Sequence, residues 1–301
     1  MRMRLTRREF ATLAAAGGAA TLTAAALAQT SEPLITRAIP SSGEPLPAVG
    51  LGTAEIFDLD SDATQQKAVA VVQALLGNGG KLIDTASTYG DAEQVLGEVT
   101  APADLRPKLF IATKLEAPDE AELKRSLARL KTAKLDLLQL HNVRDAQQSL
   151  ARFKEWKAQG VCRYIGITST FRSAKPALEA VLKRERPDFV QVDYSIDDRD
   201  AEQRILPLAA EVKAGVLTAL PFGRGRLFRA VHGRPIPDWA SGFAGSWAQF
   251  FLKYLLGDPR VTAVIPGTSD PAHMSDNLGA MRGALPDPDQ RRRMVEFLGT
   301  L

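Results

Sequence analysis

The chain contains a single cysteine, Cys162, and only three histidines, at positions 141, 232 and 273. A lone cysteine cannot form a disulfide within the chain, which excludes a disulfide-held scaffold. The histidines are scattered and have no cysteine partners at the spacing of a zinc site, so we expect no metal centre.

The chain also lacks a strong excess of charge. Its 38 Lys and Arg residues against 35 Asp and Glu residues give a net charge of +3. Four of these arginines and one glutamate lie within residues 1–28, which leaves 34 basic and 34 acidic residues in the remainder. Because the chain outside residues 1–28 is formally neutral, its charge gives no argument for a nucleic-acid partner, and we expect none.

No apolar run in the chain is long enough to be a clear membrane span. Residues 11–28 contain only Ala, Gly, Thr and Leu, follow the pair Arg7-Arg8, and end in the small-x-small triplet Ala26-Leu27-Ala28. A spanning helix needs about 20 strongly apolar residues. We therefore predict a twin-arginine export signal over residues 1–28, cleaved before Gln29, and a periplasmic mature protein that crosses the membrane already folded. An uncleaved membrane anchor is the alternative.

A Gly-x-Gly-x-x-Gly sequence is missing after the first predicted strand, which disfavours an open dinucleotide-binding fold. Instead, short apolar runs alternate with amphipathic helical segments after a predicted hairpin over Pro33–Ala48. We predict strands at Ala48–Gly52, Lys81–Asp84, Leu109–Thr113, Leu135–Leu140, Tyr164–Thr168, Phe189–Val192, Gly215–Ala219 and Ala263–Ile265. Helices are predicted at Thr64–Leu76, Ala92–Val99, Pro118–Leu130, Ala146–Ala158, Ser173–Lys183, Asp200–Val212, Ser241–Leu256, Pro271–Met281 and Asp289–Leu298. Eight such units indicate one α/β domain over residues 29–301, a parallel (β/α)8 barrel with an N-terminal hairpin cap, which we expect to be monomeric.

Three adjacent predicted strands end in polar residues. Asp84 ends the second strand, Lys114 the third and His141 the fourth, while Tyr89 lies in the loop after Asp84. Taken singly, such residues are often a helix cap, a solvated charge or a hydrogen-bonded core imidazole. Because the site of a (β/α)8 barrel lies at the carboxyl ends of its strands, we expect the four to converge there.

The chemistry of this group suits reduction of a carbonyl. Hydride addition leaves an alkoxide, which needs a proton from a nearby acid, and a phenol is a weak acid near neutral pH. A cationic Lys114 beside the Tyr89 oxygen would favour its anion, and Asp84 would hold the lysine in place. A hydrogen bond from His141 would orient the carbonyl oxygen.

The segment Leu82-Ile83-Asp84-Thr85-Ala86-Ser87-Thr88-Tyr89-Gly90, followed by Glu93 and Gly97, closely resembles the signature of the aldo-keto reductases. The resemblance extends from about Ile35 to the C-terminus. It implies a catalytic tetrad at Asp84, Tyr89, Lys114 and His141. It also implies a nicotinamide nucleotide that contacts Thr53, Asp84, Thr168, Ser169, Gln191, Phe222, Gly223, Gly267, Thr268, Ser269, His273 and Asn277.

Three features depart from the family's common pattern. Ala219 occupies the position of a tyrosine that stacks on the nicotinamide, so that stacking would fall to Phe222 or be lost. Ser169 replaces the usual carboxamide-binding asparagine. Gly267 and His273 stand where many relatives carry a Lys and an Arg for the 2′-phosphate. NADP(H) is the expected cofactor by resemblance, and NAD(H) is the alternative.

These features together predict an NADP(H)-dependent oxidoreductase that reduces aldehydes or ketones to alcohols, with Tyr89 as the general acid. Its partners would be a small carbonyl substrate and the twin-arginine export machinery, without a stable membrane anchor. Two alternatives stay open. A nucleotide-binding sensor or partner subunit would use the same barrel with little turnover, and an aldolase-like enzyme would use Lys114 to form a Schiff base.

Overall fold

A computed structural model describes residues 32–57, 62–101 and 105–300, and one compact unit spans Ile35–Leu301. The predicted export signal over residues 1–28 lies outside the described residues. Within the ranges described, no helix is long and apolar enough to cross a membrane.

Eight parallel strands, β3 to β10, form one sheet whose spatial order follows the chain order. Their bounds are β3 Leu51–Gly52, β4 Leu82–Asp84, β5 Phe110–Leu115, β6 Leu135–Leu140, β7 Cys162–Ser169, β8 Phe189–Asp193, β9 Gly215–Ala219 and β10 Ala263–Val264. The sheet closes on itself, because Val49 pairs with Val264 and Gly52 with Gly267 in parallel bridges. The predicted (β/α)8 barrel is therefore confirmed, and every strand carries its carboxyl end to the same rim.

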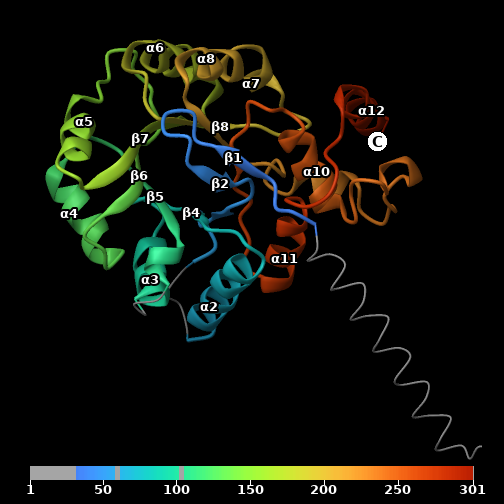
Figure 1. The fold of residues 1–301 in the computed structure, drawn as a ribbon, viewed down its shortest axis with the longest axis horizontal. Helices are drawn as coiled ribbons and strands as arrows, with labels where there is room; N and C mark the ends of the chain where they lie inside the picture. The colour runs from blue at the N-terminus through green and yellow to red at the C-terminus, as the bar shows by residue number, and fades with distance from the viewer. Residues whose placement is uncertain (1–31, 58–61, 102–104, 301) are drawn as a thin grey trace, which may run out of the picture. The chain divides into compact units, whose positions relative to one another are not determined.

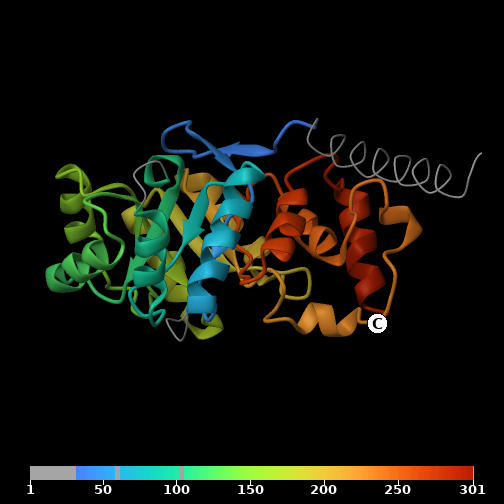
Figure 2. The same cartoon turned by 90° about the horizontal axis from the view of Figure 1, so that it is seen from below.

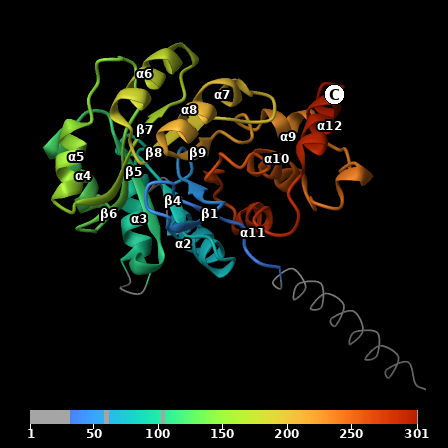
Figure 3. The ribbon, with the colours of Figure 1, turned by 45° about the horizontal axis from the view of Figure 1, so that its top comes forward.

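Helices surround the strands (Figure 1). They are α2 Asp62–Gly77, α3 Ala92–Thr100, α4 Glu120–Arg129, α5 Ala151–Ala158, α6 Lys175–Glu185, α7 Asp200–Gln203, α8 Ile205–Val212, α9 Arg226–Ala230, α10 Trp247–Leu256, α11 Pro271–Gly279 and α12 Pro288–Leu298. Short 3-10 turns lie at Arg106–Lys108, Arg172–Ala174 and Asp238–Ala240. Figure 3 shows α9, α10 and α12 gathered on one side of the barrel, where Phe228 packs on Phe251 and Trp247 on Phe297.

The predicted hairpin closes one end of the barrel. Strands β1 (Thr36–Ala38) and β2 (Pro45–Pro47) pair antiparallel and lie across that end (Figure 2). Ile39 and Leu46 of the hairpin are fully buried in the apolar cluster that fills the barrel interior. The other members of that cluster point inward from the strands, as the two-residue alternation of a strand requires. They are Leu82, Phe110, Ala112, Leu137, Tyr164, Phe189, Leu217, Ala263 and Ile265.

Three helix predictions were wrong in extent. The segment Asp200–Val212 is not one helix but two, α7 and α8, which separate at Arg204. Pro207 explains the break, since it lacks an N–H and its ring clashes with the carbonyl four residues earlier.

The other two helices begin later than predicted because local hydrogen bonds hold the preceding residues in turns. Helix α5 starts at Ala151, after Gln148 accepts the backbone N–H groups of residues 144 and 145. Helix α10 starts at Trp247, after its N-cap Ser246.

Candidate functional site

An ion pair between Asp84 and Lys114 lies at the centre of the site. Asp84 ends β4, Lys114 lies near the end of β5, and the Lys114 Nζ atom is 2.5 Å from Asp84 Oδ2. Both side chains are almost fully buried. Burial alone would lower the pKa of Lys114, but the charge of Asp84 and the hydrogen bond to it help to outweigh this effect, so that the pKa is raised. Lys114 is therefore a cation held inside the protein.

Two buried amides complete the surroundings of Asp84. Gln139 on β6 donates its Nε2–H to Asp84 Oδ1 over 3.2 Å, and Gln191 on β8 donates to Asp84 Oδ2 over 3.1 Å. Gln139 also donates to the Oε1 atom of Gln191 over 3.1 Å. Gln191 was predicted as a nucleotide contact, whereas Gln139 was not predicted. The alternation of β6 was the missed signal, because Gln139 lies two residues before His141 and so faces the same side.

Gly166 on β7 provides the space that Gln139 occupies. A Cβ atom on Gly166 would lie 2.9 Å from the Cγ atom of Gln139 and 3.1 Å from a backbone oxygen of β8. Any larger residue would push the Gln139 amide away from Asp84. The glycine is thus a packing requirement of the network.

Tyr89 is brought to the ion pair by the tight loop after β4. The loop is closed by backbone hydrogen bonds that include Tyr89 N to the carbonyl of Ala86. The Lys114 Nζ atom lies 3.4 Å from the Tyr89 hydroxyl and 4.8 Å from its ring centroid, and it also donates to the carbonyl of Thr85 over 2.8 Å. The Lys114 cation therefore faces the phenol oxygen and donates a hydrogen bond to it.

His141 follows β6 directly and sits beside the tyrosine. Its ring centroid is 5.7 Å from that of Tyr89, in an edge-on arrangement. Burial, and then the positive charges of Lys114 and Arg144, lower the pKa of His141 to about 3. The imidazole is therefore neutral near pH 7. Its Nδ1 atom lies 2.5 Å from an oxygen of Glu116, a residue that the sequence analysis did not single out.

The predicted nucleotide contacts lie around the same rim. Thr53 follows β3, Thr168 and Ser169 end β7, Phe222 and Gly223 follow β9, and Gly267, Thr268 and Ser269 follow β10, with His273 and Asn277 on α11. Thr53, Thr168, Ser169 and Asn277 are buried, whereas His273, Gly267 and Ser269 are exposed. Phe222 packs against Phe228 and Phe251, at centroid distances of 4.8 and 6.5 Å.

One of these residues carries a polar atom suited to an incoming ligand. The Oγ1 atom of Thr53 is fully buried and has no hydrogen-bond partner among the described residues. Its backbone N–H donates to the carbonyl of Asp84 over 3.0 Å, which fixes the threonine beside the ion pair. A buried hydroxyl without a partner is uncommon. The Thr53 hydroxyl fits a nucleotide whose polar groups reach the carboxyl rim of the barrel at β3.

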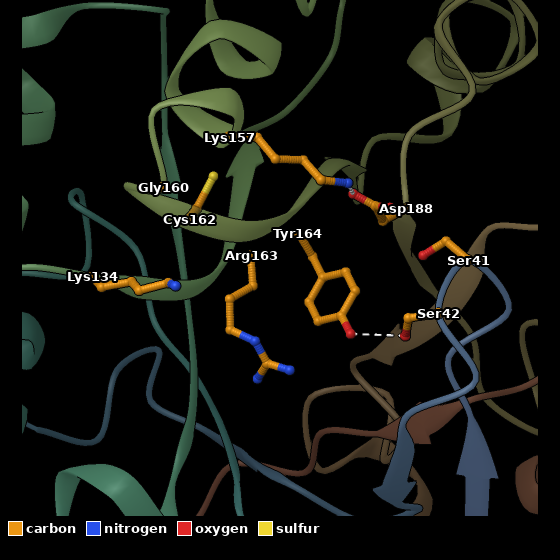
Figure 4. A pocket seen from close by; sticks show the side chains of 9 residues that line it. All are labelled: Ser41, Ser42, Lys134, Lys157, Gly160, Cys162, Arg163, Tyr164 and Asp188. Atoms are coloured by element: carbon orange, nitrogen blue, oxygen red, sulfur yellow. Dashed lines mark hydrogen bonds and ion pairs between the residues drawn. The ribbon is translucent and has the colours of Figure 1, made fainter.

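A separate pocket of about 450 Å³ lies at the opposite, hairpin end of the barrel (Figure 4). It is lined by Ser41, Ser42, Lys134, Lys157, Gly160, Cys162, Arg163, Tyr164 and Asp188. Lys157 reaches Asp188 there, and burial raises the pKa of the Cys162 thiol to about 12, so the thiol stays protonated. None of the four tetrad residues contributes to this pocket. Within the described part of the chain, no group of three or more His, Cys, Asp or Glu residues could hold a metal ion.

A parallel barrel with a buried Asp–Lys pair, a tyrosine and a neutral histidine at its carboxyl rim defines a class of barrel oxidoreductases. The model of the aldo/keto reductase family matches residues 48–296. The chain therefore belongs to the aldo/keto reductase family.

Curated relatives agree with this membership. A methylglyoxal reductase of Escherichia coli is 30% identical over 251 residues, which span 78% of this chain and 86% of the relative. The L-galactose dehydrogenase of Arabidopsis thaliana is 24% identical over 284 residues, with 81% of this chain and 87% of the relative covered.

A solved structure shows the same fold. An aldo-keto reductase from Klebsiella pneumoniae in complex with NADPH superposes with a TM-score of 0.73 at 24% identity, covering 88% of this chain and 95% of that one.

Proposed function

We propose that this protein reduces aldehydes or ketones to alcohols with a bound nicotinamide nucleotide, and that Tyr89 is the general acid. The observation that carries the proposal is the buried Lys114 cation, held by Asp84 and directed at the Tyr89 hydroxyl. A buried cation costs folding energy unless it is paired. Because the Lys114 cation lies beside the Tyr89 oxygen at the rim of the barrel, it can assist that phenol in donating a proton.

Each residue of the group has a distinct task. Tyr89 donates its hydroxyl proton to the oxygen of the substrate carbonyl, and the adjacent Lys114 stabilises the phenolate that remains. Asp84 keeps Lys114 in place, while Gln139 and Gln191 hold both oxygens of Asp84. The neutral imidazole of His141 orients the carbonyl oxygen by a hydrogen bond. When bound, the nucleotide supplies the hydride that reaches the carbonyl carbon.

We propose NADP(H) as the cofactor, with NAD(H) as the alternative. Family membership and the NADPH complex of the Klebsiella fold relative support the choice. Thr53 is the residue of this chain best suited to contact it, through its buried hydroxyl. At the start of α11 the Asp270 carboxylate accepts the N–H of Ala272 and His273 is exposed, so the charge on that helix end does not itself favour a 2′-phosphate. Dissociation constants for NADPH and NADH, measured by calorimetry, decide between the two.

Replacement of Tyr89 by phenylalanine tests the catalytic assignment. Tyr89→Phe removes the acid and keeps the ring, so we expect turnover with NADPH to fall by about 10² to 10⁴-fold. Calorimetric affinity for NADPH should change less than about threefold, since the phenol oxygen is not assigned to the nucleotide. Unchanged turnover in Tyr89→Phe would exclude Tyr89 as the acid.

Turnover measured on a panel of carbonyl substrates distinguishes an enzyme from a nucleotide-binding sensor with the same barrel. Methylglyoxal is a suitable first substrate, because a relative of 30% identity is named for its reduction. Aromatic aldehydes and simple ketones complete the panel. We expect multiple turnovers of at least one carbonyl, whereas tight NADPH binding without any turnover would favour the sensor.

We further propose that the protein acts in the periplasm after twin-arginine export. The support is the sequence of residues 1–28, with Arg7 and Arg8 before the mild apolar run. Fractionation of cells that express the full chain should recover it in the periplasm, and Arg7→Lys/Arg8→Lys should retain it in the cytoplasm.

A further inference from the structure

Glu116 lies beside His141 because the pairing of β5 with β6 places the two residues next to each other. β5 and β6 pair in parallel with Lys114 opposite Gln139 and Leu115 opposite Leu140. The backbone N–H of His141 continues this ladder by donating to the carbonyl of Leu115 over 2.8 Å. Glu116 and His141 therefore occupy the next paired position, two residues beyond the Lys114–Gln139 pair, and face the same side as that pair.

The contact occupies one particular nitrogen of the ring. The Nδ1 atom of His141 lies 2.5 Å from Glu116 Oε1 and 3.5 Å from the hydroxyl of Thr88. A neutral imidazole carries one N–H and one acceptor nitrogen. With Nδ1 turned to Glu116, Nε2 is the nitrogen available to a substrate carbonyl.

The protonation of Glu116 decides which nitrogen of His141 carries the proton. A carboxylate only accepts, so an ionised Glu116 requires the N–H on Nδ1 and leaves Nε2 without a proton. A protonated Glu116 donates its O–H to Nδ1 and leaves the N–H on Nε2. Only the second arrangement gives a carbonyl oxygen a hydrogen bond from the ring.

We propose that Glu116 is a positioning residue that selects the tautomer of His141, and that its protonated form prepares the ring to orient the substrate carbonyl. The proposal rests on the proposed reductase function for its catalytic consequence. Its structural part, the coupling of the Glu116 proton to the ring tautomer, stands without that function.

The surroundings of Glu116 extend its protonated form to higher pH than for a free glutamate. Partial burial and the Glu122 carboxylate raise the pKa of Glu116, against the opposing charge of Arg144. Glu122, on α4, accepts both the Glu116 backbone N–H over 3.3 Å and the Ser87 hydroxyl over 2.6 Å, so its position is fixed. Lys114 on β5 and the phenol of Tyr89 face His141 from the other side.

Kinetics over a pH range test the catalytic part. We expect wild-type kcat for carbonyl reduction to fall by at least about tenfold as pH rises through the titration of Glu116, because the oxyanion donor is lost. Glu116→Gln supplies a permanent N–H donor to Nδ1, so its kcat should match the acidic wild type and stay level with pH. Glu116→Ala should be slow at every pH. Persistence of the wild-type pH dependence in Glu116→Gln would overturn the proposal.

Glu122→Gln serves as the matched control. It removes a nearby carboxylate that does not contact His141, so the pH dependence should remain and its midpoint should move to lower pH. Loss of the pH dependence in Glu122→Gln would assign the titration to Glu122 instead.

Ring nitrogen NMR tests the structural part without turnover. In ¹⁵N-labelled full-length protein, the protonated nitrogen of His141 should change from Nε2 to Nδ1 as pH rises, and Glu116→Gln should keep it on Nε2. A fixed tautomer in the wild type would overturn the proposal even if Tyr89→Phe confirms the reductase. A changing tautomer with an inactive panel would refute only the proposed function.

Discussion

The two ends of the barrel both carry clusters of charged residues, but they use charge differently. At the hairpin end, Glu44 bonds Arg163 and Tyr164, and Arg163 also pairs with Asp136. Glu44 and Arg163 remain partly open to solvent, with 23% and 37% of their side chains exposed, whereas Tyr164 and Asp136 are buried. At the carboxyl rim, Asp84 and Lys114 are 3% and 1% exposed. Ion pairs in water contribute little, whereas a buried pair is costly to break.

The difference shows why a charged cluster alone does not identify a site. At the hairpin end the charged groups connect the β1–β2 hairpin to the barrel, and their bonds help to close that end of the barrel. At the rim the pair is excluded from water, and the cation it holds is directed at the Tyr89 hydroxyl. At the hairpin end the Tyr164 phenol donates to the Glu44 carboxylate, whereas at the rim the Lys114 cation faces the Tyr89 oxygen. Burial of the ion pair together with a cation at the phenol oxygen therefore distinguishes the functional end.

Removal of Lys114 should produce the largest effect. Lys114→Met leaves the buried charge of Asp84 without its partner, so the free energy of unfolding should fall by about 3–5 kcal/mol. Turnover should fall by at least about 10³-fold, because Tyr89 loses its cation. Urea unfolding followed by circular dichroism, and steady-state kinetics, measure the two effects.

A double variant separates stability from catalysis at the same position. Asp84→Asn/Lys114→Met replaces the ion pair by neutral groups and should recover most of the stability lost in Lys114→Met, while turnover stays low. Recovery of turnover together with stability would mean that Lys114 acts only as a structural residue.

Acidification should destabilise the rim through His141. The folded-state pKa of about 3 lies below the ordinary value of 6.5, so below pH 6.5 the unfolded chain binds a proton that the folded protein does not. Stability is therefore present above pH 6.5 and is lost as pH falls, by up to about 1.4 kcal/mol per pH unit.

Urea unfolding at pH 7, 6 and 5 checks this slope. His141→Gln should lose stability less steeply with acid than the wild type does. His273→Gln, an exposed substitution on α11, is the matched control and should keep the wild-type slope. Equal slopes in His141→Gln and the wild type would contradict the assignment.

Sequence patterns predicted the barrel because strands and helices differ in the spacing of their apolar residues. The eight strands were found, and Asp84, Lys114 and His141 were recognised as polar ends of apolar runs. Gln139 and Glu116 were missed although each lies two residues from a recognised one, on the same face of its strand. Their roles depend on the register of neighbouring strands, and closure of the sheet sets that register rather than any local pattern.

Loops and helix starts were harder to predict for a different reason. Helix α9 and the 3-10 turn at Asp238–Ala240 lie between β9 and α10, where no helical periodicity was recognised. Phe228 of α9 packs on Phe251 and Trp239 of the turn on Phe250, so distant aromatic contacts stabilise these short segments. Helices this short depend on tertiary packing rather than on their own sequence.

The smallest effect is expected at the hairpin end, from Glu44→Gln. Partial burial opposes ionisation, but hydrogen bonds from Tyr164 and Arg163 hold the pKa of Glu44 below its ordinary value. A depressed carboxyl pKa contributes stability above the unfolded value of 4.5 that is lost as pH falls. Because Glu44 and Arg163 are partly exposed to solvent, Glu44→Gln should lower the free energy of unfolding by only about 0.2–1 kcal/mol at pH 7. Thermal unfolding should show this difference at pH 7 and its progressive loss as pH falls below 4.5, with kcat and KM unchanged. A fall in kcat would mean that the hairpin end is coupled to the rim, and the separation of the two ends would then fail.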